Sequence, residues 1–251
     1  MKRLALLVVA TVVVGGIAFL VARRASVHAQ TGARKAFTAI YIDSGYKPDW
    51  TLALRQAGIY AVRGDGSTVE AQSEELPNHE WVTVRSVVDL AARKRTSVSP
   101  ETESISTYAL SDAALAHYQR PDTSCSAQSS APHATILGYD TVQVHSEITH
   151  PPGIVLKSDR WLAPALDCYP LRVRSFFGST GGPPSPNFRE VVAVMEGEPS
   201  PALFAIPEGY TERSPSEANA EYMKRFPGKT QFPESTGRKL DEIYERTHQP
   251  Q

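Results

Sequence analysis

The clearest indication of the fold is the stretch LRVRSF at residues 171–176. Its apolar Leu171 and Val173 alternate with the charged Arg172 and Arg174. Successive side chains of a β-strand point to opposite faces of a sheet, so this period of two predicts a strand with one buried face.

Short stretches of the same kind recur along most of the chain. They fall at residues 37–42, 59–63, 68–70, 81–90, 95–98, 104–108, 142–148, 154–161 and 188–195. The sequence GDGS at residues 64–67 is a tight-turn signal between two of them and predicts a hairpin. Regularly spaced short strands of this kind predict one antiparallel, β-rich domain with helices added, an α+β class of fold.

The longest alternating stretch, residues 81–90, changes phase near its end. Val82 and Val84 alternate with polar neighbours, but Val87 and Val88 are adjacent apolar residues. One extra residue in a strand produces such a change of phase, so this pair predicts a β-bulge or a bend.

Helix signals stand at three places. Ser111 is typical of an N-cap for a short helix over residues 111–119. Ser214, Pro215 and Glu217 predict a helix start with a capping box. Residues 238–247 place apolar side chains at helical spacing near the end of the chain. The predicted organisation is therefore an N-terminal segment 1–29, a linker 30–35, a β-rich domain 36–213 and a helical tail 214–251.

The N-terminus predicts export from the cytoplasm. Residues 4–22 form an uncharged apolar run between Lys2-Arg3 and Arg23-Arg24. The run is long enough to anchor the chain in a membrane, whereas the ending Val27-His28-Ala29 fits cleavage of a signal peptide. Both alternatives place residues 30–251 outside the cytoplasm, in the periplasm or on the outer face of the inner membrane.

The net charge of -1 combines two unlike parts. Residues 1–29 hold four of the 26 basic residues and no acidic one, which leaves 22 basic and all 27 acidic residues, a charge of -5, for residues 30–251. A nucleic-acid partner is therefore not expected, because it requires a basic surface.

The two cysteines fit an exported protein. Cys125 and Cys168 lie in polar, turn-like sequence, unlike the surroundings of a buried free thiol. In an oxidising compartment such a pair predicts one disulfide, with two unpaired thiols as the alternative. A zinc site would need further ligands, and neither a metal nor another cofactor is predicted.

No catalytic residues can be assigned from motifs. The chain has no Gly-x-Ser-x-Gly, no phosphate-binding loop and no His-x-x-x-His. A hydrolase with an unusual site would require His145, His150 and a carboxylate to converge. The missing motifs favour binding over catalysis, and an enzymatic role is left open.

A family resemblance rests on segments in both halves of the chain. They are ILGY at 136–139, DRWLAPAL at 159–166, GEP at 197–199, LFAIPEGY at 203–210, and the shorter segments at 63–67, 87–89 and 98–100. Their order resembles a group of uncharacterised exported bacterial proteins, whose pattern is similar to the half-barrels of LolA/LolB-like lipoprotein carriers. This sequence departs from the acylated carriers because no cysteine follows its apolar run.

The resemblance implies a curved antiparallel sheet or half-barrel with C-terminal helices and an N-terminal apolar helix. The apolar concave face of such a sheet can hold an acyl chain or a peptide. The candidate ligand-binding residues on that face, each of which also fits an ordinary core position, are Tyr60, Val62, Val84, Trp161, Val173 and Phe204.

These observations favour an extracytoplasmic, non-enzymatic protein that binds a hydrophobic ligand or an envelope partner. Its expected partners are a lipid or an envelope protein, and the membrane itself through residues 4–22 if these are not cleaved. The alternatives are a membrane-anchored structural or assembly component and an envelope hydrolase with a non-standard site.

Overall fold

The computed structural model describes residues 34–127, 131–150, 154–179, 182–231 and 234–248. The described residues all belong to one compact unit of the chain. The predicted N-terminal apolar helix, with its signal or anchor at 1–29, lies outside the described residues. Among the helices that are described, none is both long and apolar enough to cross a bilayer.

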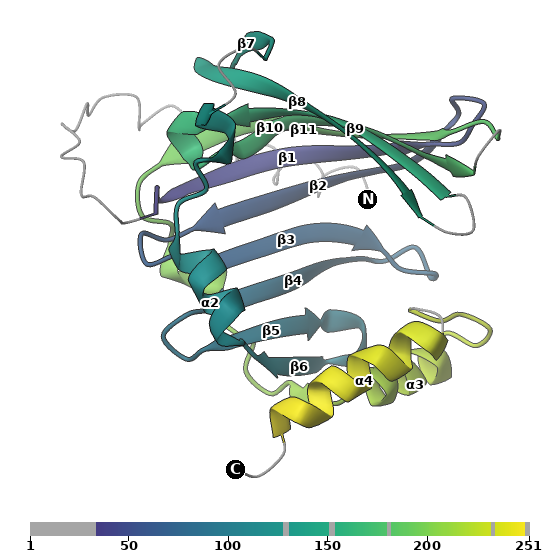
Figure 1. Ribbon diagram of the computed structural model, residues 1–251. Coiled ribbons are helices and arrows are strands. Elements are labelled where there is room, and N and C mark those ends of the chain that lie inside the picture. Colours follow the sequence, from purple (N-terminus) through teal and green to yellow (C-terminus); the bar gives the residue numbers. More distant parts are fainter. Residues whose placement is uncertain (1–33, 128–130, 151–153, 180–181, 232–233, 249–251) are drawn as a thin grey trace, which may run out of the picture. The chain divides into compact units, whose positions relative to one another are not determined.

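Twelve strands form one sheet (Figure 1), in the order β12-β6-β5-β4-β3-β2-β1-β11-β10-β9-β8-β7. Every neighbouring pair is antiparallel except β12 and β6, which are parallel. The strands are β1 (Phe37–Tyr46), β2 (Leu52–Val62), β3 (Thr68–Glu75), β4 (Trp81–Asp89), β5 (Lys94–Ser99), β6 (Ser104–Ala109), β7 (His133–Ile136), β8 (Tyr139–His150), β9 (Ile154–Ala163), β10 (Tyr169–Ser179), β11 (Ser185–Glu196) and β12 (Thr211–Glu212).

The sheet consists of two meanders that meet at β1 and β11. Strands β1 to β6 follow one another across one half, and β7 to β11 follow one another across the other. Strand β1 pairs with β11 from Phe37 opposite Glu196 to Gly45 opposite Asn187, with one register shift after Ile40. This long-range pairing makes one continuous sheet out of two locally formed ones.

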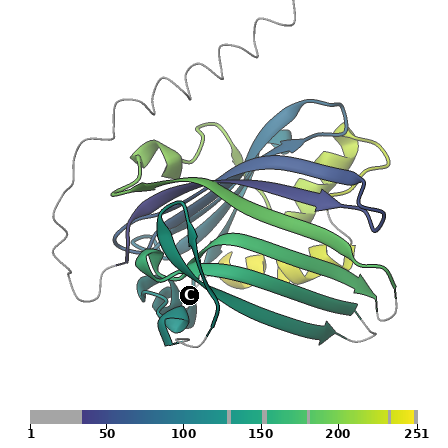
Figure 2. The same ribbon diagram turned by 90° about the horizontal axis from the view of Figure 1, so that it is seen from above.

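The sheet is open and curved, and its helices cover the concave face (Figures 1 and 2). Helix α2 (Asp112–Gln119) packs Leu115 against Val88 and Leu90, while α3 (Pro215–Arg225) packs Tyr222 and Phe226 against Leu76. Helix α4 (Glu234–His248) lies beside α3 and β6. The predicted β-rich class, with a curved antiparallel sheet and C-terminal helices, is confirmed for the described residues.

The predicted helix starts are also confirmed. The Ser111 hydroxyl accepts a hydrogen bond from the backbone N–H of Ala114. Ser214 and Glu217 form a complete capping box, in which each side chain accepts from the other residue's backbone N–H. Both helices begin where a side-chain oxygen satisfies an N–H group that has no partner within the helix.

The predicted bulge at Val87 and Val88 is wrong. Strand β4 keeps one register with β3 and with β5 through both residues. Both valines are buried because the sheet is covered on both faces at this point. Leu115 of α2 packs on Val88, and Leu203 of η4 (Pro201–Phe204) packs on the cluster that contains Val87. Two adjacent apolar residues thus mark two-sided burial.

The predicted disulfide is confirmed, since Cys125 is bonded to Cys168. It joins η2 (Ser124–Ala127) to the turn between η3 (Pro164–Leu166) and β10. Both cysteines are buried, and they pack with Leu162 and Val144. The sequence around the two cysteines is polar and turn-like, yet the cysteines are buried. They are buried because the disulfide itself is part of a small apolar cluster.

We expect Cys125→Ala with Cys168→Ala to lower the free energy of unfolding by about 4 kcal/mol, since the bridge closes a 43-residue separation in the unfolded chain. Urea unfolding measures the effect. Reductant should lower the stability of the unaltered protein by a similar amount and leave the variant unchanged. A difference below about 1 kcal/mol would contradict this account of the bridge.

Candidate functional site

An ion network lies at the centre of the concave face. Arg189 of β11 forms two hydrogen bonds with Asp43 of β1, from Nε to Oδ1 and from Nη2 to Oδ2, both at 2.8 Å. Its Nη1 donates to Oε1 of Glu70 on β3 at 3.0 Å. Direct register pairing of Arg189 with Asp43 makes the two-pronged contact possible. Such fork-like pairs are directional as well as strong.

Tyr41 extends the network across the sheet. Its hydroxyl donates to Oε1 of Glu70 at 2.8 Å, and the Arg189 guanidinium lies 3.8 Å from the centre of its ring. The ring crosses strand β2 over Gly58, where an added Cβ would lie only 2.2 Å from ring atom Cζ. Gly58 is therefore the position that gives the Tyr41 ring its path to Glu70 on β3.

Burial sets the protonation of these groups. Burial raises the pKa of Tyr41 well above its ordinary value, and the nearby Glu70 carboxylate adds to the effect. Burial opposes the charge on Arg189, but its hydrogen bonds to Asp43 and the nearby Tyr41 and Glu70 together outweigh this and hold its pKa above the ordinary value. At neutral pH Tyr41 is thus a neutral phenol and Arg189 a cation.

Three aromatic rings form a floor beside the network, which we call the aromatic floor: Phe37, Tyr60 and Tyr169. The rings of Tyr60 and Tyr169 stack with centroids 4.8 Å apart, and the Phe37 centroid lies 5.1 Å from that of Tyr169. Burial raises the pKa of Tyr60 to about 12. The Tyr169 hydroxyl is buried and has no hydrogen-bond partner among the described residues.

A cavity of ≈ 570 Å³ lies over the aromatic floor. Its other side is helix α2, through Ala113, Ala116 and His117. The side chains around its margin are charged or apolar; they include Arg34, Arg120, Asp122, Leu166 and Asp167. A concave pocket with an apolar floor and a few polar groups is the usual form of a small-molecule site.

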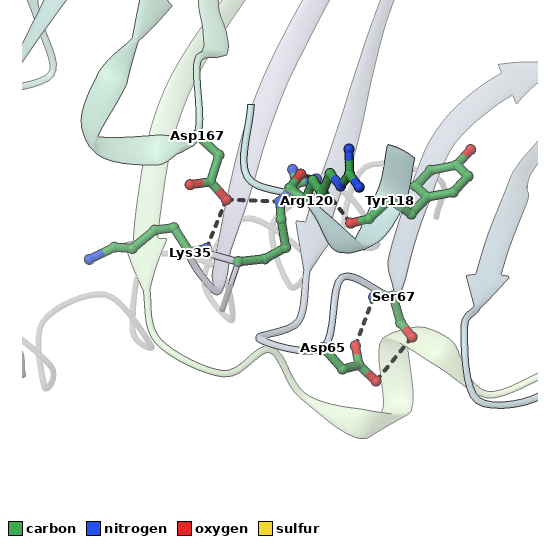
Figure 3. A network of polar contacts seen from close by, with 7 residues as sticks. Lys35, Asp65, Ser67, Tyr118, Arg120 and Asp167 are labelled. Atoms are coloured by element: carbon green, nitrogen blue, oxygen red, sulfur yellow. Dashed lines mark hydrogen bonds and ion pairs between the residues drawn. The ribbon is translucent and has the colours of Figure 1, made fainter. Parts of the chain in front are cut away.

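Arg34 ties the margin of the cavity together. Its Nε donates to Oδ2 of Asp167 at 2.8 Å, and its Nη1 donates to the backbone oxygens of Tyr118 and Arg120 at 3.0 and 2.9 Å. The backbone N–H of Lys35 donates to the same Asp167 oxygen, as Figure 3 shows. This clamp holds the C-terminal end of α2 close to the turn that precedes β10.

The six candidate ligand-binding residues do not share one face. Register places Tyr60, Val62, Val84 and Val173 on the concave face with Glu70 and Arg189. Of these, Tyr60 lines the cavity beneath α2, and Val62 is fully buried in the core beside Phe37. Val84 and Val173 line two separate shallow pockets farther along the sheet.

The other two candidates lie on the convex face. Trp161 lies beside Arg172 and Arg174, whose guanidinium carbons are 5.5 and 5.4 Å from its ring centre. Phe204 packs with the cluster of Ala61 and Val69, and Arg63 stacks over its ring at 3.9 Å. Trp161 nevertheless packs against the same core cluster as Tyr60, which contains Val62 as a buried member, whereas Phe204 belongs to a different cluster.

The concave face is not uniformly apolar, which corrects the expectation from the sequence. Between the aromatic floor and α3 it carries polar side chains, namely Gln56, Gln72, Ser86, Ser97, Ser175 and Asn187. The ion network lies among them. Apolar lining is therefore local and does not extend along the whole trough: it occurs over the aromatic floor and, between the sheet and the C-terminal helices, around Leu110, Ala218 and Leu240.

The residues of the ion network were not found from sequence. Arg189, Asp43 and Glu70 look like outward-facing charges when each strand is considered alone. The sequence indicates the network only when three strands are considered together, because each of them has a charged residue at a position that faces inward. The pairing of β1 with β11 would have to be known before these charges could be matched.

Among the described residues no catalytic arrangement surrounds His145, and the side chain of His150 lies outside the described part of the structure. The Nδ1 atom of His145 lies 2.9 Å from Asp159 Oδ1, on the exposed surface of β8 and β9. No hydroxyl or thiol of a described residue is bonded to this pair. Among the described residues, no group of three or more potential metal ligands occurs.

No family model and no curated protein sequence matches the chain. Among solved structures, it is similar to the LolA superfamily protein NE2245 of Nitrosomonas europaea, with 9% identity over 69% of this chain and 91% of that one and a TM-score of 0.33. It is also similar to LprF of Mycobacterium bovis, with 11% identity over 68% and 90% and a TM-score of 0.28. The predicted LolA-like resemblance is thus found again among structures, at TM-scores too low to support an inference about ligand or location.

We expect Gly58→Ala to cost about 1–3 kcal/mol of stability, because the new methyl group would meet the Tyr41 ring and displace its hydroxyl from Glu70. Gly64→Ala is the matched control, since the nearest atom to its added Cβ lies 3.8 Å away. Thermal or urea unfolding of both variants tests this. Equal stability of the two would show that Tyr41 is not held over Gly58.

We expect alkaline pH to weaken the fold partly through Tyr60. Between about pH 10 and 12 the unfolded state loses this phenolic proton while the folded state keeps it, so the free energy of unfolding falls as the pH rises. The loss reaches about 2–3 kcal/mol at most. Tyr60→Phe should show a smaller fall in urea unfolding over this range. An identical fall in both proteins would contradict the burial of this hydroxyl.

Proposed function

We propose that this protein is an extracytoplasmic, non-enzymatic binding protein for an amphipathic ligand whose apolar part enters the cavity between α2 and the sheet. The observation that carries the proposal is the aromatic floor beneath a cavity of ≈ 570 Å³. A pocket of this size is within the range used for small molecules.

The way α2 is attached supports a binding role. The helix packs on the sheet through Leu115 and is clamped at its C-terminal end by Arg34. Ala113 and Ala116, in contrast, turn small side chains toward the cavity. Larger side chains at these two positions would have filled the space, so the sequence keeps the cavity open while holding its cover in place.

The chemistry of the cavity suggests an amphipathic ligand over a purely apolar one. The rings of Phe37, Tyr60 and Tyr169 offer apolar and stacking contact. Charged side chains at the margin can meet a polar head group.

The proposed location rests on two features of the chain. Residues 1–29 have the pattern of an export signal or anchor. The buried Cys125–Cys168 disulfide is typical of proteins that fold in an oxidising compartment. Both support a place in the periplasm or on the outer face of the inner membrane, where a lipid is an available amphipathic ligand.

We expect Ala116→Trp to reduce ligand binding at least tenfold, since the indole would occupy the space over the aromatic floor. Binding is measured by the fluorescence increase of a dansyl-labelled fatty acid. Gln119→Trp is the matched control, because Gln119 lies on the same helix but does not line the cavity. It should bind like the unaltered protein.

Both variants should unfold at urea concentrations near that of the unaltered protein. Failure of the unaltered protein to bind the probe, or equal binding by both variants, would overturn the proposed site. Native mass spectrometry of protein recovered from its own cell envelope adds a direct test. A co-purifying lipid supports the proposal, whereas a stoichiometric protein partner without lipid favours a structural role.

A further inference from the structure

Several exposed large apolar side chains lie at one end of the sheet, while others, such as Leu137, Val192, Met195 and Met223, lie elsewhere. Among the described residues, those about half exposed at this end include Trp50, Leu52, Leu54, Ile148 and Phe177. Trp50, Leu52 and Leu54 belong to the tip and second strand of the β1–β2 hairpin, and Phe177 and Ile148 both neighbour Leu156 in the register of β9. A cluster of this kind marks an interaction surface, whereas isolated exposed residues need no explanation.

The hairpins β1–β2 and β10–β11 lie side by side at this end (Figures 1 and 2). Gly45 pairs with Leu54 on one side and with Asn187 on the other. We call their apolar residues Trp50, Leu52, Leu54 and Phe177 the hairpin rim. This end of the sheet is opposite the end that α2 covers, so the hairpin rim is separate from the cavity.

A hydrogen-bonded turn holds Trp50 in its exposed position. Its backbone N–H donates to the Lys47 oxygen at 2.9 Å, and the Asp49 carboxylate accepts from the Thr51 N–H at 3.0 Å. Trp50 adopts a φ of 65°, a conformation that bulky residues rarely take. The ring lies 6.2 Å from Tyr46 and 6.3 Å from Phe188, so aromatic neighbours support it from behind.

Basic side chains outnumber acidic ones around the hairpin rim. Lys47, Arg55 and Arg174 are exposed, and none of them forms an ion pair with another described residue. The acidic residue of the turn, Asp49, accepts a hydrogen bond from the backbone N–H of Thr51, which lowers its pKa and keeps it an anion, so it offsets one of the three cations. The neighbouring β3–β4 tip is acidic, with Glu75 beside His79, and is not part of the rim.

A lipid surface fits these features better than a second copy of the chain. A two-fold contact through the rim would bring Lys47 and Arg55 of one copy toward the same cations of the other. A bilayer requires no matching shape, and tryptophan, tyrosine and basic side chains favour its interface. We propose that the hairpin rim docks the protein onto an anionic lipid bilayer, with Trp50 and Leu52 entering the head-group region.

The test follows Trp50 itself. The full chain with Trp81→Phe and Trp161→Phe keeps Trp50 as its single tryptophan, since the sequence has three. We expect its fluorescence to shift to the blue and to be quenched by brominated phosphatidylcholine in vesicles that also contain phosphatidylglycerol. The fluorescence of a chain that keeps Trp161 as its single tryptophan should not be quenched. This comparison is independent of residues 1–29, which both chains share.

Charge reversal tests the electrostatic part. Lys47→Glu with Arg55→Glu should weaken the response at least tenfold, because each basic residue near an anionic surface contributes roughly a factor of five. Lys94→Glu is the matched control: Lys94 is an exposed cation at the far end of β5, and its variant should respond like the parent.

Two results would overturn the proposal. In the first, anionic vesicles do not quench the fluorescence of Trp50. In the second, the double charge reversal does not change this quenching. A concentration-dependent dimer that Leu52→Ser abolishes would assign the rim to a second copy instead. Ala116→Phe separates this proposal from the proposed function, since it fills the cavity without adding a second tryptophan and should leave the Trp50 response intact. Urea unfolding of each variant excludes loss of folding as the cause.

Discussion

The pairing of β1 with β11 is the constraint on which the rest of the structure depends. It joins two meanders that are each formed by neighbours in sequence, and it aligns residues about 150 positions apart. The fork-like contact between Asp43 and Arg189 lies within this pairing, where it adds a directional ion pair to backbone hydrogen bonds that carry no sequence preference. Such non-local pairing forms only after a large loop has closed, so an interaction that selects one register has particular value here.

The same contact determines the character of the concave face. Because Arg189 is held between Asp43 and Glu70, the middle of the trough is charged and hydrogen-bonded. The apolar surface over the aromatic floor, next to the clamp that Arg34 makes with Asp167, is thereby separated from the rest of the trough. A sheet that was expected to present an apolar groove along its length is instead interrupted by charge at its middle.

The features that could be predicted from the sequence depend on local signals. Alternation at 171–176, the turn at 64–67 and the caps at Ser111 and Ser214 each involve residues within a few positions of one another, and each is confirmed. The cysteine pair was predictable because the chain has no other cysteine. The side of the sheet was not predictable for Trp161 and Phe204, since burial alone does not distinguish two covered faces. The misread pair Val87 and Val88 has the same cause: a helix covers one face there and η4 covers the other.

Antiparallel order separates the two surfaces proposed for function. In a meander every second connection lies at the same end, so the α2 cavity and the hairpin rim occupy opposite ends of the same strands. Strand β1 runs from Phe37 in the aromatic floor through Asp43 in the ion network to Tyr46 beside Trp50. One strand therefore contributes a side chain to each of the three chemically distinct regions. Its inward positions change from apolar at Phe37 to charged at Asp43. The apolar ligand is therefore proposed for the end near Phe37, and the contact with a surface for the end near Tyr46.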